Sequence, residues 1–198
     1  MIKTIIFDNG GVIVEDQWLK FENDLYDKYG RNSGSIVETI KSYGKESTNG
    51  RLSFDGLIEH IRELTKTTDD FYALYHPKGS KKAVISFIKI LGKDYELALL
   101  TNELSNFDRD NKVWKLEKYF GENIFQSSKM GFSKPDTRTF EYVLSTLGKK
   151  PSEAVFIDDK ISNIEGARKV GMNVIQFISL EQLKKDLPVL IERSNGKK

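Results

Sequence analysis

The chain has 198 residues, of which 38% are hydrophobic and 30% are charged, with 31 lysines and arginines against 29 aspartates and glutamates. The formal net charge of +2 gives no reason to expect a nucleic acid or a membrane surface as a partner. The lack of cysteine excludes disulfides and thiolate metal sites, and no apolar run approaches the roughly 18 residues that span a bilayer. We therefore expect a cytoplasmic protein without a signal peptide, built as one domain or as one domain with an insertion.

The first predicted element is a short buried strand. Residues 2–7 form a dense run of apolar and β-branched side chains, which is typical of a strand covered on both faces. The run ends at Asp8, and Gly10 and Gly11 follow closely. A carboxylate in this place lies where open α/β sheets bind ligands, although Asp and Gly are also ordinary turn residues.

The next block of the chain, residues 15–77, is predicted to be wholly helical and to form a small inserted cap. Ser53 is expected to be an N-cap, and Gly30 and Pro77 to end helices. Helical spacing predicts the following helices: 16–29, 35–43, 54–64 and 71–75. Four aromatic residues are expected to form the core of the cap, with one or two of them facing a pocket: Trp18, Phe21, Phe54 and Phe71.

From residue 78 the pattern alternates between helices and strands. The predicted strands are 97–100, 124–127, 154–157 and 174–177, and residues 128–135 are predicted to form a loop. The predicted helices are 81–91, 107–119, 137–147, 163–170 and 181–191, the last one broken by Pro188. This alternation predicts an α/β fold, a parallel sheet with helices on both faces. Residues 1–14 and 78–198 would form this core, and residues 15–77 the cap.

Polar side chains follow three of the predicted strands. Asp8 follows the first strand, Thr101 and Asn102 follow the second, and Asp158 and Asp159 follow a later one. The carboxyl ends of parallel strands meet at one edge of a sheet, so these groups should lie together. Clustered carboxylates without His or Cys favour Mg²⁺, which keeps positions open for water and a substrate phosphate. The alternative for the two adjacent aspartates is a helix N-cap.

A lysine belongs to the same set of candidates. Lys134 follows the flexible stretch SSKMGFS and precedes Pro135 and a predicted helix. A lysine fixed in this loop could neutralise both the carboxylates and a substrate phosphate, although most lysines are simply solvated.

Four segments of the chain resemble the motifs of the haloacid dehalogenase superfamily: FDNGGV, LLTNE, SKPD and VFIDDKISNIEGARKVGM. The resemblance covers essentially the whole chain and implies a Rossmann-like core with an inserted helical cap. It implies that Asp8 is a nucleophile that forms an aspartyl-phosphate, which water then hydrolyses. It further implies that Lys134 orients Asp8 and offsets the developing charge.

The same resemblance assigns the remaining polar residues. Asp8 and Asp159 would bind Mg²⁺. Asp158, beside them, would either bind the ion directly or contact one of its ligands. Thr101 and Asn102 would hold the phosphoryl oxygens through their hydroxyl and amide groups.

One position departs from the pattern of most phosphatases in this family. They carry a second Asp two residues after the nucleophile, as general acid and base, where this chain has Gly10. The backbone carbonyl of Gly10 can still bind the metal, but the lost acid–base help would cost roughly 10²–10⁴ in rate for an alkoxide leaving group. Glu15, Asp16 and carboxylates of the cap are unranked candidates to replace it. A subgroup with the pattern FDxGxV resembles this chain closely and is regarded as small sugar-phosphate phosphatases.

The sequence therefore predicts a Mg²⁺-dependent phosphatase that acts on a small phosphorylated metabolite, such as a sugar phosphate. Three alternatives remain open: a metal-independent 2-haloacid dehalogenase, a non-catalytic binding or regulatory protein that kept the fold, and a phosphomutase. The phosphomutase is the least favoured of them, because its reaction needs the missing acid–base Asp twice. The adjacent pair Asp158 and Asp159 favours phosphoryl chemistry over dehalogenation. The substrate's identity and the oligomeric state are left open.

Overall fold

A computed structural model describes the chain apart from residues 30–33, 76–78, 104–105, 195 and 197–198, and apart from the side chains of residues 34–38. Its strands are β1 (Thr4–Phe7), β2 (Glu96–Thr101), β3 (Ile124–Gln126), β4 (Ala154–Asp158) and β5 (Asn173–Gln176). The helices of the cap region are α1 (Gln17–Tyr29), α2 (Gly34–Thr48), α3 (Phe54–Thr65) and α4 (Phe71–Leu74). The other helices are α5 (Lys82–Leu91), α6 (Phe107–Trp114), α7 (Glu117–Phe120), α8 (Ser127–Met130), α9 (Thr137–Leu147), the short 3-10 helix η1 (Pro151–Glu153), α10 (Ile161–Lys169) and α11 (Leu180–Ser194).

The strands form one parallel sheet in the order β3-β2-β1-β4-β5, which confirms the predicted α/β class. Strand β1 lies in the middle, with Phe7 opposite Leu99 of β2 and opposite Ile157 of β4. This register brings the carboxyl ends of β1, β2 and β4 to the same edge of the sheet.

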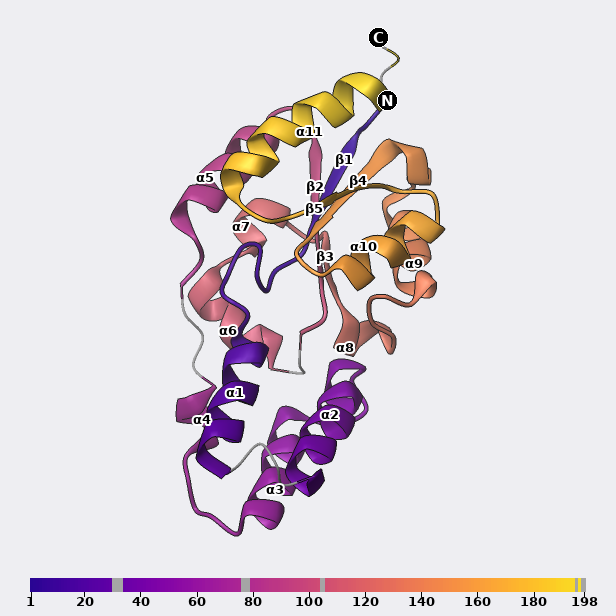
Figure 1. Ribbon diagram of the computed structural model, residues 1–198. Coiled ribbons are helices and arrows are strands. Elements are labelled where there is room, and N and C mark those ends of the chain that lie inside the picture. Colours follow the sequence, from indigo (N-terminus) through magenta and orange to yellow (C-terminus); the bar gives the residue numbers. More distant parts are fainter. Residues whose placement is uncertain (30–33, 76–78, 104–105, 195, 197–198) are drawn as a thin grey trace.

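Each face of the sheet carries its own hydrophobic core, because successive side chains of a strand point to opposite faces. Ile5 and Phe7 pack with α5, α6, α7 and α11, whereas Ile6 packs with α9 and α10. Figure 1 shows α5 and α11 on one side of the sheet and α9 and α10 on the other. Within the described part of the chain, no helix is long and apolar enough to cross a membrane.

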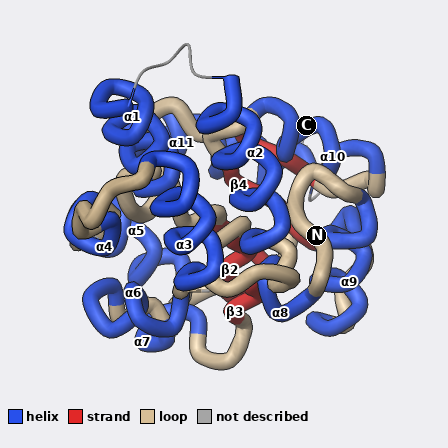
Figure 2. Tube along the Cα trace, turned by 90° about the horizontal axis from the view of Figure 1, so that it is seen from below, coloured by secondary structure: helices blue, strands red, loops and turns tan. Residues whose placement is uncertain are grey.

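Helices α1 to α4 lie beyond the carboxyl edge of the sheet, opposite the two termini (Figure 1). Seen from that side in Figure 2, α1, α2 and α3 lie in front of the strands. Their apolar side chains form a separate cluster that contains Phe21, Phe54 and Phe71. A distinct core agrees with an inserted cap, but its limits at residues 15 and 77 stay a prediction. Gly30 and Pro77, expected to end helices, fall outside the described residues.

The structure corrects two predictions on the β2–α9 segment. The helix expected over residues 107–119 is split, because Lys115 adopts a left-handed conformation (φ 55°) and its N–H bonds to the carbonyl of Asn111. The Asn111 side chain also accepts a hydrogen bond from the N–H of Leu116 at 2.9 Å, which stabilises the break. The loop expected over residues 128–135 begins with the short helix α8, which ends at Gly131.

Pro188 does not break the last helix. Helix α11 runs from Leu180 to Ser194 with Pro188 inside it. Both Pro188 and Lys184 are exposed, so the Lys184 carbonyl that loses its helical partner can be hydrated. The buried side chains of the helix, Leu183 and Leu187, still pack on the sheet.

Candidate active site

Asp8 lies one residue beyond β1 and is buried, with 6% of its surface exposed. Its backbone N–H continues the sheet by bonding to the Ile157 carbonyl at 2.9 Å. Its Oδ1 atom accepts a hydrogen bond from the N–H of Asn9 at 2.7 Å and lies 2.7 Å from Nζ of Lys134. These contacts fix the carboxylate and leave Oδ2 as the oxygen with no hydrogen bond assigned to it among the described residues.

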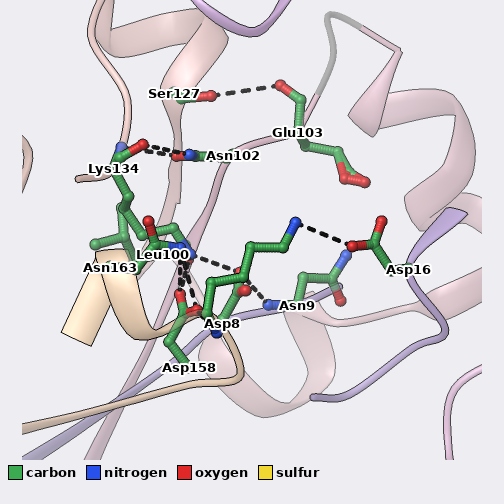
Figure 3. Close-up of polar contacts among 11 residues, drawn as sticks. Asp8, Asn9, Asp16, Leu100, Asn102, Glu103, Ser127, Lys134, Asp158 and Asn163 are labelled. Atoms are coloured by element: carbon green, nitrogen blue, oxygen red, sulfur yellow. Dashed lines mark hydrogen bonds and ion pairs between the residues drawn. The ribbon is translucent and has the colours of Figure 1, made fainter. Parts of the chain in front are cut away.

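Lys134 is fully buried at the centre of the site (Figure 3). Its ammonium group contacts Oδ1 of Asp8 at 2.7 Å and Oδ2 of Asp158 at 2.8 Å, and it donates to the Leu100 carbonyl at 2.9 Å. All three N–H bonds of the ammonium therefore have an acceptor. Asn102 holds the backbone of Lys134 in place, with its amide donating to the Lys134 carbonyl at 2.8 Å and accepting from the Lys134 N–H at 2.9 Å.

The two adjacent aspartates at the end of β4 have different surroundings. Asp158 is fully buried and accepts hydrogen bonds from the Lys160 N–H at 2.8 Å and from the Asn163 amide at 3.0 and 3.1 Å, besides its contact with Lys134. Asp159 is half-buried, and its enclosed Oδ1 atom has no hydrogen-bond partner among the described residues. Asp158 is therefore suited to hold Lys134, and Asp159 is suited to bind a further group.

Burial and the neighbouring charges together set the ionisation of the site. Burial raises the pKa of Asp8 to about 7, against the opposing effect of Lys134. Burial alone would lower the pKa of Lys134, but Asp158 and Asp8 outweigh it, so this pKa is raised. Burial would raise the pKa of Asp158, but Lys134 keeps it below its usual value. At Asp159, burial and the charge of Asp158 both raise the pKa.

The residues present fit a divalent cation. One carboxylate oxygen each from Asp8, Asp158 and Asp159 lies within 4.8 Å of the others. The donors are hard oxygens, the kind that Mg²⁺ prefers, and the enclosed Oδ1 atom of Asp159 has no partner within the described part of the protein. Asp8 and Asp159 are the residues best placed to hold the ion, because the oxygens of Asp158 already have protein partners.

A cavity of about 280 Å³ opens above this cluster, between the sheet edge and the cap. Asp8, Gly10, Thr101, Asn102 and Lys134 all line it, so the structure brings most of the predicted site residues to one place. Asp158 and Asp159 are not among the residues that line this cavity. The amide of Asn102 is engaged with Lys134, whereas no hydrogen bond is assigned to the Thr101 hydroxyl among the described residues. The roles of these residues stay predictions.

Further residues of the site escaped the sequence analysis. Lys160, just after the aspartate pair, forms an ion pair at 2.9 Å with Asp16, the residue before α1. Asn163 bonds to Asp158 as described above, and Glu103 lines the cavity with only 8% of its surface exposed. In Figure 3 the Glu103 carboxyl lies on the same side of the site as Asp16. The residue after Thr101-Asn102 was visible in the LLTNE segment, but a single Glu has no pattern of its own.

The family model for haloacid dehalogenase-like hydrolases matches residues 2–171 of the chain. The chain belongs to the haloacid dehalogenase-like hydrolases. This membership confirms the resemblance of the four motifs. The match includes α1 to α4 of the cap region and the core up to residue 171.

Similar proteins include D-ribitol-5-phosphate phosphatase of Bacteroides thetaiotaomicron, 25% identical over 96% of this hydrolase and 99% of the phosphatase. Acyl-CoA dehydrogenase family member 10 of Mus musculus is also 25% identical over 96% of this chain, which spans 19% of that longer protein. A HAD family enzyme of Bacteroides thetaiotaomicron superposes with a TM-score of 0.79 at 19% identity, over 94% of this chain and 98% of that one. The structure of that enzyme in complex with magnesium and inorganic phosphate superposes with a TM-score of 0.72 at 20% identity, over 92% of this chain and 99% of that one. At these identities the structures show the shared fold.

An added methyl group at Gly11 tests how closely the backbone of this residue packs against Asp159. Gly11 has a φ of +81°, and a Cβ atom there would lie 2.3 Å from Oδ2 of Asp159. We expect Gly11→Ala to displace Asp159 and to lower the melting temperature by about 2–8 °C, because the left-handed conformation costs roughly 1–2 kcal/mol. Gly10→Ala is the matched control, since its Cβ would meet no atom closer than 3.9 Å. Equal melting temperatures of the two variants would contradict the prediction.

Glu103 should make the stability of the hydrolase depend on pH. Burial, followed by repulsion from Asp110 and Asp8, raises its pKa from 4.5 to about 8. The folded protein therefore keeps a proton that the unfolded chain releases, and stability falls as pH rises through this window. We expect Glu103→Gln to gain stability over the wild type on going from pH 5 to pH 9, by on the order of a few kcal/mol. Urea unfolding of both proteins at each pH measures this gain, and Glu122→Gln, on an exposed turn, is the control.

Proposed function

We propose that this hydrolase is a Mg²⁺-dependent phosphatase that cleaves a small phosphorylated metabolite through an aspartyl-phosphate on Asp8. The observation that carries the proposal is the buried unit of Asp8, Lys134 and Asp158, with an oxygen cluster that suits Mg²⁺. The similar D-ribitol-5-phosphate phosphatase supports phosphoric monoesters of sugars or polyols as the substrate class. The related fold in complex with magnesium and inorganic phosphate supports the metal.

Each residue of the unit has a task in this reaction. Oδ2 of Asp8 attacks phosphorus, since Oδ1 is held by Asn9 and Lys134. The Lys134 ammonium keeps the nucleophile oriented and offsets charge that develops on the phosphoryl group. Mg²⁺, held by Asp8, Asp159 and the Gly10 carbonyl, would neutralise phosphoryl charge when bound. Thr101 lines the cavity, and its hydroxyl would donate to a phosphoryl oxygen there.

The space around the site suits a small ester. The inner cavity adjoins an outer one of about 740 Å³, and both are lined by Trp18, Thr48, Asn102, Lys134 and Pro135. The cap thus leaves room for a phosphoryl group inside and for the rest of a metabolite outside, within the size range of small-molecule sites. Of the cap aromatics, Trp18 faces this pocket, whereas Phe21, Phe54 and Phe71 are buried in the cap core.

The proposal is tested by phosphate release from 4-nitrophenyl phosphate and from a panel of sugar and polyol phosphates, with Mg²⁺ and with EDTA. We expect turnover that requires Mg²⁺. Metal-independent halide release from a 2-haloacid would instead favour the dehalogenase alternative. No turnover of any substrate, with Mg²⁺ binding shown by calorimetry, would favour the non-catalytic alternative.

A further inference from the structure

We propose that Glu103 donates a proton to the leaving oxygen of the phosphate ester and later accepts one from the attacking water. The assignment rests on the proposed phosphatase function. It gives Glu103 the role of general acid and base, for which Gly10 has no side chain. Glu103 follows β2, two residues after Thr101, and its side chain lines the inner cavity together with Asp8 and Gly10. It therefore faces the space in which an ester attacked by Asp8 must lie.

The other carboxyl groups of this cavity are already engaged. Among the described lining residues, carboxyl groups belong to Asp8, Asp16 and Glu103. Asp8 is the nucleophile. Oδ2 of Asp16 pairs with Lys160 at 2.9 Å and Oδ1 accepts from the Leu19 N–H at 3.0 Å, so both oxygens of this carboxyl are engaged. No hydrogen bond is assigned to the carboxyl of Glu103 within the described part of the chain, which leaves it able to exchange a proton with bound substrate.

Of the residues proposed from sequence to replace the missing acid, Glu15 is exposed and does not line the inner cavity. The Tyr75 phenol does line the cavity, but burial and the Glu103 charge raise its pKa well above 10, which makes it a poor acid.

The surroundings of Glu103 keep its carboxyl protonated at neutral pH. Burial and the nearby negative charges raise its pKa to about 8, and Lys134 opposes them weakly. The titratable and charged groups that face it come from several elements: Asp8, Asp16, Asp110, Lys134 and Tyr75. A general acid is most effective when its pKa lies near the working pH.

The proton balance closes over the two halves of the reaction. When Oδ2 of Asp8 bonds to phosphorus, the bond from phosphorus to the ester oxygen breaks and its electron pair stays on that oxygen. The Glu103 proton moves to this oxygen and the alcohol leaves. Water then gives a proton to the Glu103 carboxylate while its oxygen bonds to phosphorus, and the electron pair of the aspartyl bond returns to Asp8. Inorganic phosphate leaves with both residues in their starting states.

Leaving-group dependence tests the assignment, because a good leaving group needs little protonation. The probes are 4-nitrophenyl phosphate, phenyl phosphate and ribitol 5-phosphate, in order of rising basicity of the leaving oxygen. We expect Glu103→Gln to lower kcat/KM for ribitol 5-phosphate by roughly 10²–10⁴-fold, and for 4-nitrophenyl phosphate by less than about tenfold. The wild type should also lose ribitol 5-phosphate activity at high pH, where Glu103 ionises, with a smaller loss for 4-nitrophenyl phosphate.

Two further variants separate the possible results. A Cβ at Gly10 meets no atom within 3.9 Å, so Gly10→Asp can place a carboxyl in the cavity. The double variant Gly10→Asp with Glu103→Gln should hydrolyse ribitol 5-phosphate at least about tenfold faster than Glu103→Gln alone, by general acid catalysis. Equal losses on all three phosphates would overturn the assignment, as would a leaving-group-dependent loss in Tyr75→Phe instead of Glu103→Gln. If the wild type hydrolysed none of the phosphates, the proposed function would fail and this inference with it.

Discussion

Asp8→Asn is expected to reduce phosphate release from 4-nitrophenyl phosphate by roughly 10⁴-fold or more, the scale seen when an enzyme loses its nucleophile. Asparagine has nearly the same shape, and its oxygen can keep the contacts that Oδ1 makes with Asn9 and Lys134. What it lacks is the negative charge and the free oxygen that attack phosphorus. An aryl phosphate is the sharpest probe, because its leaving group needs little acid and the loss then reports on Asp8 itself.

The control for this variant is Asp94→Asn, which removes a carboxylate from an exposed turn of the same core. We expect its activity and melting temperature to match the wild type. Thermal unfolding of Asp8→Asn should be as cooperative as that of the wild type, since the substitution removes the charge of one of the two carboxylates that contact the Lys134 ammonium group. Asp8→Asn activity within tenfold of the wild type would exclude an aspartyl-phosphate on this residue.

The layout of the core could be predicted because its signals are local. Each buried strand is a short apolar run, and Ile5 and Ile6 on opposite faces already require a layer of helices on each side. Parallel pairing then brings the residues after β1, β2 and β4 together without any knowledge of side-chain contacts. Asp8, Thr101 and the aspartate pair were found for this reason.

The roles within the cluster could not be predicted in the same way. Asp158 and Asp159 are adjacent and identical in the sequence, yet Asp158 is enclosed by Lys134 and Asn163, while Asp159 keeps one oxygen without a hydrogen-bond partner in the part of the chain that the structure describes. Glu103 escaped notice because its importance comes from burial in a cavity between core and cap, which no spacing records. The break at Lys115 depends likewise on one side chain, that of Asn111, capping the chain from a distance.

Lys134→Met is expected to destabilise the protein by about 3–5 kcal/mol, the usual cost of removing one partner of a buried ion pair. Methionine keeps the length of the side chain but leaves Asp8 and Asp158 buried without the cation that both contact. The Leu100 carbonyl also loses its donor. Urea unfolding in EDTA measures the loss, and phosphate release should fall with it, because Asp8 loses the ammonium group that orients it and offsets phosphoryl charge.

The pH dependence separates this electrostatic cost from a packing defect. Without Lys134, burial and mutual repulsion favour the protonated forms of the two carboxyls, which raises their pKa values in the folded protein. The destabilisation that these two unpaired carboxyls cause is then small at low pH and grows as pH rises. The stability of the variant should therefore be closer to that of the wild type at pH 5 than at pH 8. Adding Asp158→Asn removes one unpaired charge and should recover part of the stability without recovering activity. A loss that is equal at both pH values, and unchanged in the double variant, would mean that Lys134 matters for its packing and not for its charge.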